Sequence, residues 1–242
     1  MNYFVGSLYG NYNNYCEIKR QLKLKPHDTL WILGDILDGN DENPEDCISI
    51  LYDIMNSSNI HLVLGDHEFA HIMRHLSITD KERYETWGDY IENLEVSGTS
   101  LLYYIENILD DYEKDELFGF LINECEITNF IRIGDNYFYL VHGFPSVYKR
   151  NTSEWQLLST TNTIQDINYI QAIKTDPSVP DEYIKTINSN NCFVICSHQN
   201  NIDNTDTFFK NGVFLLNENI PNKSICILGI DAAGYFNKEI IY

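Results

Sequence analysis

The chain has 242 residues, of which 16 are Lys or Arg and 36 are Asp or Glu, so its formal net charge at pH 7 is −20. Such a charge repels phosphate backbones and anionic lipid headgroups, which argues against a nucleic-acid partner and against docking on a membrane. It suits metal cations and a basic protein or peptide partner, although solubility alone explains it equally well. The length fits one domain with a sizeable core.

No N-terminal segment combines a basic head with a long apolar stretch, and no apolar run approaches the roughly 20 residues that a membrane-spanning helix needs. The six cysteines have no zinc-finger spacing. Most lie within apolar strand or helix patterns, where they behave as small buried thiols in a reducing compartment. We therefore expect a cytoplasmic protein, and the sequence gives no signal of its oligomeric state.

The first part of the chain alternates apolar strands with amphipathic helices. Strands are predicted at residues 2–6, 29–33 and 61–64. Apolar residues at helical spacing place a helix between the first two strands, and it ends before Pro26. Pro44 at a first helical position begins a second helix, which ends near residues 56–58. This β-α-β-α-β order implies parallel strands with right-handed crossovers.

The second part of the chain is predicted to begin with helices and to end in strands. Residues 69–126 are mostly helical in pattern, and Gly134-Asp135-Asn136 separates strands at 130–133 and 137–141, as in a hairpin. Helices and loops are expected over 144–190, and three closing strands at 192–196, 212–216 and 224–230. No linker or repeat divides the chain. We expect one α/β (α+β) domain over residues 1–242, a β-sandwich of mixed sheets flanked by helices, with a helical insertion at about 69–126.

Four of the predicted strands end on side chains that bind metals. These side chains are Asp35 and Asp38, then Asp66 and His67, then His142, and finally His198. In open α/β sheets the carboxyl ends of the strands are where ligands bind, and carboxylate and imidazole suit Mn, Fe or Zn. A lone histidine after a strand is more often a core or surface residue, but four such strand ends are harder to explain in that way.

The order and content of these stretches resemble the calcineurin-like metallophosphoesterases, in particular their Ser/Thr protein-phosphatase branch. That family reads D-x-H, G-D-x-x-D-R, G-N-H-E, H-G and G-H-x-P. The corresponding stretches are Ser7-Leu8-Tyr9, Gly34-Asp35-Ile36-Leu37-Asp38-Gly39, Gly65-Asp66-His67-Glu68, His142-Gly143 and Ser197-His198-Gln199-Asn200, and residues 230–235 look like the final strand and turn. The resemblance covers nearly the whole chain and implies a metallophosphatase-like sandwich.

The resemblance also implies a metal site, with departures. One divalent metal, Mn, Fe or Zn, would be bound by Asp35, Asp66, His142 and His198. The family's other metal also needs the Asp and His of D-x-H, where this chain has Ser7 and Tyr9. A neutral hydroxyl and a phenol with a pKa of about 10 are poor ligands, so we expect that second site to be lost.

The residues that handle the phosphoryl group are retained only in part. By resemblance, His67 is the general acid that protonates the leaving oxygen, and Asp38 is the carboxylate that orients it. The family's phosphate-binding Arg is replaced by Gly39, which offers no bidentate guanidinium contact. We do not expect Arg74, the nearest basic alternative in the sequence, to replace it.

His71 and His75 are one helical turn apart, a spacing that can bind zinc. No third ligand accompanies them in the sequence, so we expect both side chains to face solvent.

Three functions remain open. The favoured one is a pseudophosphatase that acts by binding or regulation, with a protein or a phosphorylated ligand as its partner. The alternative is an active phosphomonoesterase or protein phosphatase that uses a single metal at the four strand-end ligands, with His67 as the acid. The third is a structural or interaction protein without a metal.

Overall fold

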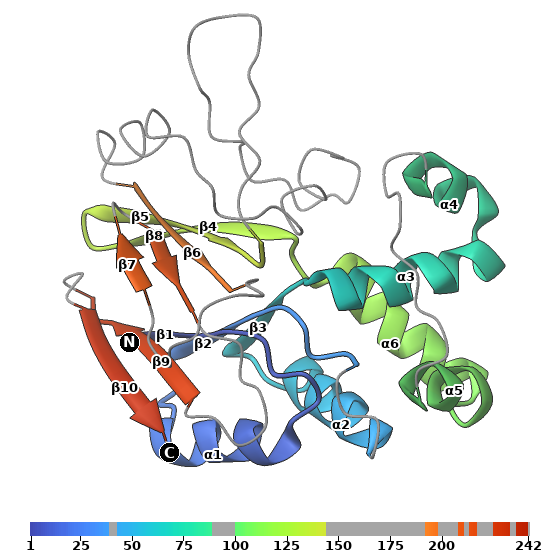
Figure 1. Ribbon diagram of the computed structural model, residues 1–242, viewed down its shortest axis with the longest axis horizontal. Coiled ribbons are helices and arrows are strands. Elements are labelled where there is room, and N and C mark those ends of the chain that lie inside the picture. Colours follow the sequence, from blue (N-terminus) through green and yellow to red (C-terminus); the bar gives the residue numbers. More distant parts are fainter. Residues whose placement is uncertain are drawn as a thin grey trace, which may run out of the picture.

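The structure is a computed structural model of the chain. It describes residues 1–38, 43–88, 100–143, 192–197, 208–210, 213–216, 225–232 and 236–241. Three sequence predictions lie outside these residues, namely Gly39, the segment 144–190 and the proposed ligand His198. In the described part, two five-stranded mixed sheets face each other, with helices on the outer side of one of them (Figure 1). The predicted sandwich of mixed sheets flanked by helices is confirmed.

The first sheet contains the amino-terminal strands in the order β10-β9-β1-β2-β3. Its strands are β1 (Asn2–Val5), β2 (Thr29–Leu33), β3 (Ile60–Val63), β9 (Ile225–Ile230) and β10 (Phe236–Ile241). β1, β2 and β3 are parallel, because helices α1 (Tyr12–Leu22) and α2 (Pro44–Met55) cross over between them. β9 pairs antiparallel with β1, and β10 pairs antiparallel with β9 at the edge of the sheet. The β-α-β-α-β unit is therefore as the sequence predicts.

The second sheet has the order β4-β5-β6-β8-β7. Its strands are β4 (Thr128–Ile133), β5 (Asn136–Val141), β6 (Cys192–Cys196), β7 (Phe208–Lys210) and β8 (Val213–Leu215). β4 and β5 form the predicted hairpin, whereas β5, β6 and β8 are parallel. The three predicted closing strands are present as β6, β8 and β9, but the prediction missed β7 and β10. β7 has only three residues, and β10 carries Asn237, Lys238 and Glu239 in its middle.

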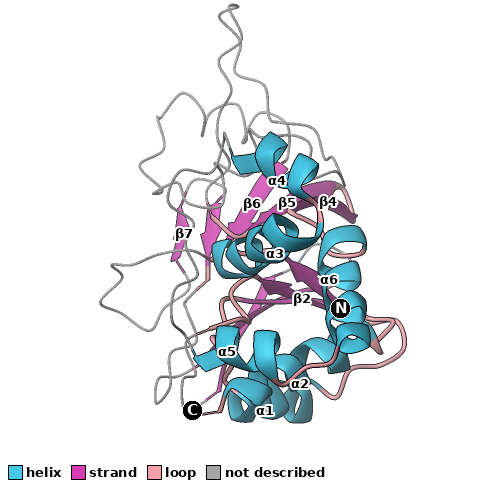
Figure 2. Cartoon of the chain, turned by 90° about the vertical axis from the view of Figure 1, so that its right-hand side faces the viewer, coloured by secondary structure: helices cyan, strands magenta, loops and turns pink. Residues whose placement is uncertain are grey.

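The helices between β3 and β4 carry the chain from one sheet to the other. They are α3 (Asp66–Thr79), α4 (Lys81–Gly88), α5 (Ser100–Asn107) and α6 (Asp111–Asn123). α5 lies beside α2, on the same side of the first sheet as α1 and α2 (Figure 1 and Figure 2). Asp110 and Glu113 form a reciprocal capping box that begins α6. No helix in the described ranges is both long and apolar enough to cross a membrane.

Two apolar clusters hold these layers together. Between the sheets lie Phe4, Trp31, Leu33, Val63, Phe138, Leu140, Ile195, Phe214 and Leu228, among others. On the other face of the first sheet, Val5, Ile32 and Leu62 pack with residues from α1, α2, α3, α5 and α6. The central strands are thus buried on both faces, which explains their continuous apolar runs and fixes where their carboxyl ends lie.

Candidate metal centre

Glycines let the ends of β2, β3 and β5 approach one another closely. Gly34, at φ +79°, follows β2, and a Cβ there would clash with the His142 ring and with the Cα of Gly65. A Cβ at Gly65 would in turn clash with Asp35. Asp35 itself lies in the left-handed region at φ +52°. Because both glycines lack a side chain, backbone and ligand groups from three strands fit into one small volume.

The carboxylate of Glu68 fixes the turn that carries Asp35. Glu68 is fully buried, and each of its oxygens accepts two backbone N–H groups. The donors are Asp35 and Gly65 at 2.8 Å each to Oε2, and Ile36 and Leu37 at 2.7 and 2.8 Å to Oε1. Burial and the neighbouring Asp35 carboxylate raise the pKa of Glu68, and the amide donors oppose that shift. Glu68 therefore joins the β2 turn to the start of α3.

Asp35, Asp66 and His142 form a compact cluster at these strand ends. Their ligating atoms all lie within 4.8 Å of one another. His142 Nε2 is 3.1 Å from Asp35 Oδ2 and 3.3 Å from Asp66 Oδ1. Asp35 and His142 are fully buried, and the Asp66 side chain is 17% exposed.

The tautomer of His142 determines whether its Nε2 can bind a cation. Its Nδ1 lies 2.7 Å from the carbonyl oxygen of Leu33, which can only accept, so Nδ1 carries a proton. In the neutral ring, Nε2 then presents a lone pair to the oxygens of Asp35 and Asp66. Burial alone would lower the pKa of His142, but these carboxylates raise it well above its ordinary value. A divalent cation between the three groups satisfies the same geometry, because metal-binding histidines typically donate their other N–H to a backbone carbonyl.

The structure thus brings together three of the four ligands that the sequence predicts. Asp35, Asp66 and His142 converge, whereas His198 lies outside the described residues.

The turn after β1 carries Ser7 and Tyr9, two of the residues at which the sequence departs from the family motifs. Ser7, which follows β1, is fully buried, and its backbone N–H donates to Ser197 Oγ at 2.9 Å. The two serine hydroxyls lie 3.2 Å apart. The backbone N–H groups of Leu8 and Tyr9 donate to the carbonyl oxygen of Asp35, so this turn lies directly against the metal cluster. A neutral hydroxyl pair therefore lies next to the turn that carries Asp35.

The pair proposed for acid catalysis lies beside the cluster. His67 Nδ1 is 3.4 Å from Asp38 Oδ2, which is a long hydrogen bond. Partial burial alone would lower the pKa of His67, but Asp38 and the carboxylates of the metal cluster raise it to about 9. The ring of Tyr9 meets the His67 ring edge to face, with the centroids 5.7 Å apart.

The prediction that His71 faces solvent is wrong. Its side chain is 1% exposed, and its Nε2 lies 2.9 Å from the same oxygen of Asp38. His71 is four residues after His67 on α3, so the two rings lie on neighbouring turns of one helix face. The i, i+4 spacing of His67 and His71 is visible in the sequence, whereas the prediction considered His71 only with His75. His75 stacks on Phe118 and is partly buried.

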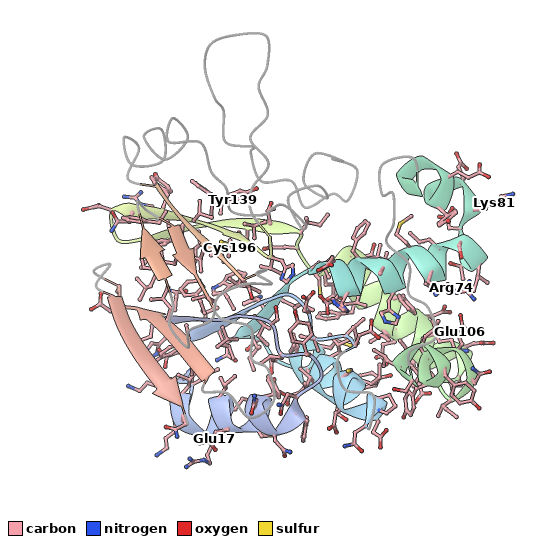
Figure 3. The ribbon with its side chains drawn as sticks, in the orientation of Figure 1. Glu17, Arg74, Lys81, Glu106, Tyr139 and Cys196 are labelled. Carbon is pink, nitrogen blue, oxygen red and sulfur yellow. The ribbon has the colours of Figure 1, made fainter. Side chains whose placement is uncertain are left out.

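Arg74, the nearest basic alternative in the sequence, pairs with an acidic residue of α5. Its guanidinium donates to Glu106 of α5 at 2.9 Å, and both side chains are partly exposed. Figure 3 shows the two labelled residues together on the helical side of the molecule, at the far end of α3 from Asp66. That Arg74 does not replace the phosphate-binding Arg stays a prediction.

Two facing mixed sheets with an Asp-Asp-His cluster at their strand ends define a metallophosphatase-like fold. The family model described as calcineurin-like phosphoesterase matches residues 3–227, and the chain belongs to that family. A search of curated proteins gave no match.

Solved structures with a related fold are distant in sequence. A hypothetical protein from Pyrococcus horikoshii OT3 is 13% identical, with a TM-score of 0.49, over 100% of this chain and 88% of that one. A metallophosphoesterase from Sphaerobacter thermophilus is 14% identical, with a TM-score of 0.47, over 100% and 87%. A putative 5'-nucleotidase from Staphylococcus aureus is 13% identical, with a TM-score of 0.38, over 99% and 53%.

Proposed function

We propose that this chain binds one divalent metal at Asp35, Asp66 and His142, with His198 as a fourth ligand. In this proposal the loaded site recognises a phosphorylated ligand, free or on a protein, and acts by binding or regulation. The protein is then a pseudophosphatase related to the Ser/Thr phosphatase branch.

The hydroxyl pair of Ser7 and Ser197 carries this proposal. Two-metal phosphoester hydrolysis uses both ions to hold the attacking and leaving oxygens. On one side of Asp35 the charged groups Asp66 and His142 face each other, and this arrangement requires a cation or a proton. On the other side Ser7 is buried against Ser197 and offers no charge.

The remaining residues support ligand binding. A bound metal would supply positive charge for phosphoryl oxygens. His67 adds a hydrogen-bond donor next to it, because Asp38 favours the protonated ring. Without the guanidinium that Gly39 replaces, a phosphoryl ligand loses one bidentate contact, which favours weak or selective recognition.

A second candidate is a slow phosphomonoesterase or protein phosphatase that uses the same single metal. The observation that favours it is the retained contact of His67 with Asp38, since a general acid beside the site is what hydrolysis needs.

Turnover of p-nitrophenyl phosphate by the full chain, with and without Mn²⁺, separates the two candidates. The pseudophosphatase predicts binding of inorganic phosphate to the metal-loaded chain and negligible turnover. Robust Mn²⁺-dependent turnover that collapses in His142→Ala establishes the single-metal enzyme instead. A chain that binds neither metal nor phosphate contradicts both.

A further inference from the structure

The carboxylate of Asp38 is held more closely by a residue outside the family's motifs than by the proposed acid. His71 Nε2 lies 2.9 Å from Asp38 Oδ2, whereas His67 Nδ1 lies 3.4 Å from the same atom. A carboxylate only accepts, so His71 Nε2 carries the proton and donates it to Asp38. The His71 side chain is 1% exposed and the Asp38 side chain is 9% exposed, so water competes little for this bond.

Asp38 needs such support because its backbone is strained. It lies at φ +62°, in the left-handed region that non-glycine residues rarely adopt. Strained residues of this kind persist where several surrounding contacts hold them. The buried His71 ring is one such contact, and it comes from α3, the helix that also carries Asp66 and His67.

We infer that His71 is a positioning residue, which fixes the Asp38 carboxylate and through it the orientation of the His67 ring towards a phosphoryl ligand. The chain of contacts runs from His71 Nε2–H to Asp38 Oδ2 and then to His67 Nδ1. With Nδ1 of His67 directed at Asp38, its Nε2 is the ring nitrogen left for the ligand. This inference rests on the proposed function, because it needs a phosphoryl group at the metal cluster.

A matched pair of variants tests it. His71→Gln places an amide donor near the position of the lost Nε2, whereas His71→Met has a similar length, tolerates burial and donates no hydrogen bond. The control is His75→Met, one turn later on α3, where the ring stacks on Phe118. Affinity for inorganic phosphate is measured by calorimetry on the full chain loaded with Zn²⁺, and Zn²⁺ affinity is measured on the same samples.

His71→Met is expected to weaken phosphate binding about 10-fold, which is the scale of a lost hydrogen bond to a charged group. His71→Gln should recover most of that loss, His75→Met should bind as wild type, and all variants should keep the Zn²⁺ affinity. The ¹⁵N spectrum of the Zn²⁺-loaded chain gives a second readout. The His67 Nδ1 resonance should move in His71→Met and stay in place in His71→Gln.

Phosphate affinity and a His67 resonance that are both unchanged in His71→Met would overturn the inference. Equal losses in the Met and Gln variants, or a loss of Zn²⁺ binding in both, would also overturn it, because they indicate a purely structural role. If His71→Met does not fold, His71→Asn replaces it, since its amide is too short to reach Asp38. A wild type that binds Zn²⁺ but no phosphate contradicts the proposed function alone, and the His67 resonance still decides the role of His71.

Discussion

The two sides of Asp35 differ in the charge of the groups that lie there. On one side, His142 lies 3.1 Å from Asp35 and 3.3 Å from the carboxylate of Asp66 in a largely buried volume. On the other side, Ser7 and Ser197 satisfy each other through neutral hydrogen bonds. Because burying unpaired charge is costly, the first side depends on a cation or a proton, and the second side is stable without either. In the proposed function, the first side therefore binds the metal, and the hydrogen-bonded serines keep the second side stable without one.

The largest effect is expected on Mn²⁺ affinity when His142 is removed. His142→Ala should weaken Mn²⁺ binding by more than about 100-fold, since even residues that only support a metal ligand are worth about 10–100-fold. Titration calorimetry on the full chain measures this loss. Ser7→Ala is the matched control on the neutral side, and it should leave the Mn²⁺ affinity unchanged. Similar losses in the two variants would show that the two sides are not distinct.

The next effect concerns Glu68, which fixes the turn that carries Asp35, and it is measured as a change in the free energy of unfolding. Glu68→Gln replaces two acceptor oxygens by one, so at least one pair of backbone N–H groups loses its partner. We expect the free energy of unfolding to fall by about 2–3 kcal/mol, as for buried hydrogen bonds to a charged group. Urea denaturation of the metal-free chain measures it. Glu113→Gln makes the same chemical change at the exposed capping box of α6, where the expected cost is below about 1 kcal/mol. Equal costs would mean that Glu68 does not fix the β2 turn.

The third effect concerns substitutions that add metal ligands on the Ser7 side of Asp35. Ser7→Asp with Tyr9→His supplies a carboxylate and an imidazole next to Asp35, and the metal content should rise from one towards two per chain. Addition of Gly39→Arg should then tighten phosphate binding without changing the metal content. Elemental analysis and phosphate calorimetry measure the two steps. A repaired chain that folds and still binds a single metal would show that Ser7 and Tyr9 are not what closes the second site.

The smallest effect is expected at Arg74. Arg74→Ala removes an exposed ion pair with Glu106, which is worth no more than about 1 kcal/mol. Phosphate affinity of the metal-loaded chain should not change. A clear loss of phosphate binding would mean that Arg74 replaces the missing guanidinium after all.

The parts of this molecule that follow from local pattern could be read from the sequence. The strand Thr29–Leu33 was predicted with its observed bounds, because a buried parallel strand is a continuous apolar run that ends at glycine. The approach of Asp35 and Asp66 followed from β2 and β3, parallel neighbours whose carboxyl ends share one edge of the first sheet. His142 reaches them from the end of β5 in the second sheet.

Features that depend on tertiary context could not be predicted. Ser7 and Ser197 are 190 residues apart, and no local signal pairs two serines over that distance. β10 was not recognised because the polar residues in its middle interrupt the apolar pattern that predicts a strand. His71 was assigned to solvent although its i, i+4 spacing to His67 was visible. Its burial depends on contact with Asp38, which lies in the turn after β2 and not on α3.

Anomalous diffraction from crystals grown with Mn²⁺ tests the central claim most directly, because it locates each bound ion relative to both sides of Asp35. We expect one peak per chain, in contact with Asp35, Asp66 and His142, and an intact hydrogen bond between Ser7 and Ser197. Two peaks per chain, or a single peak on the Ser7 side, would contradict it.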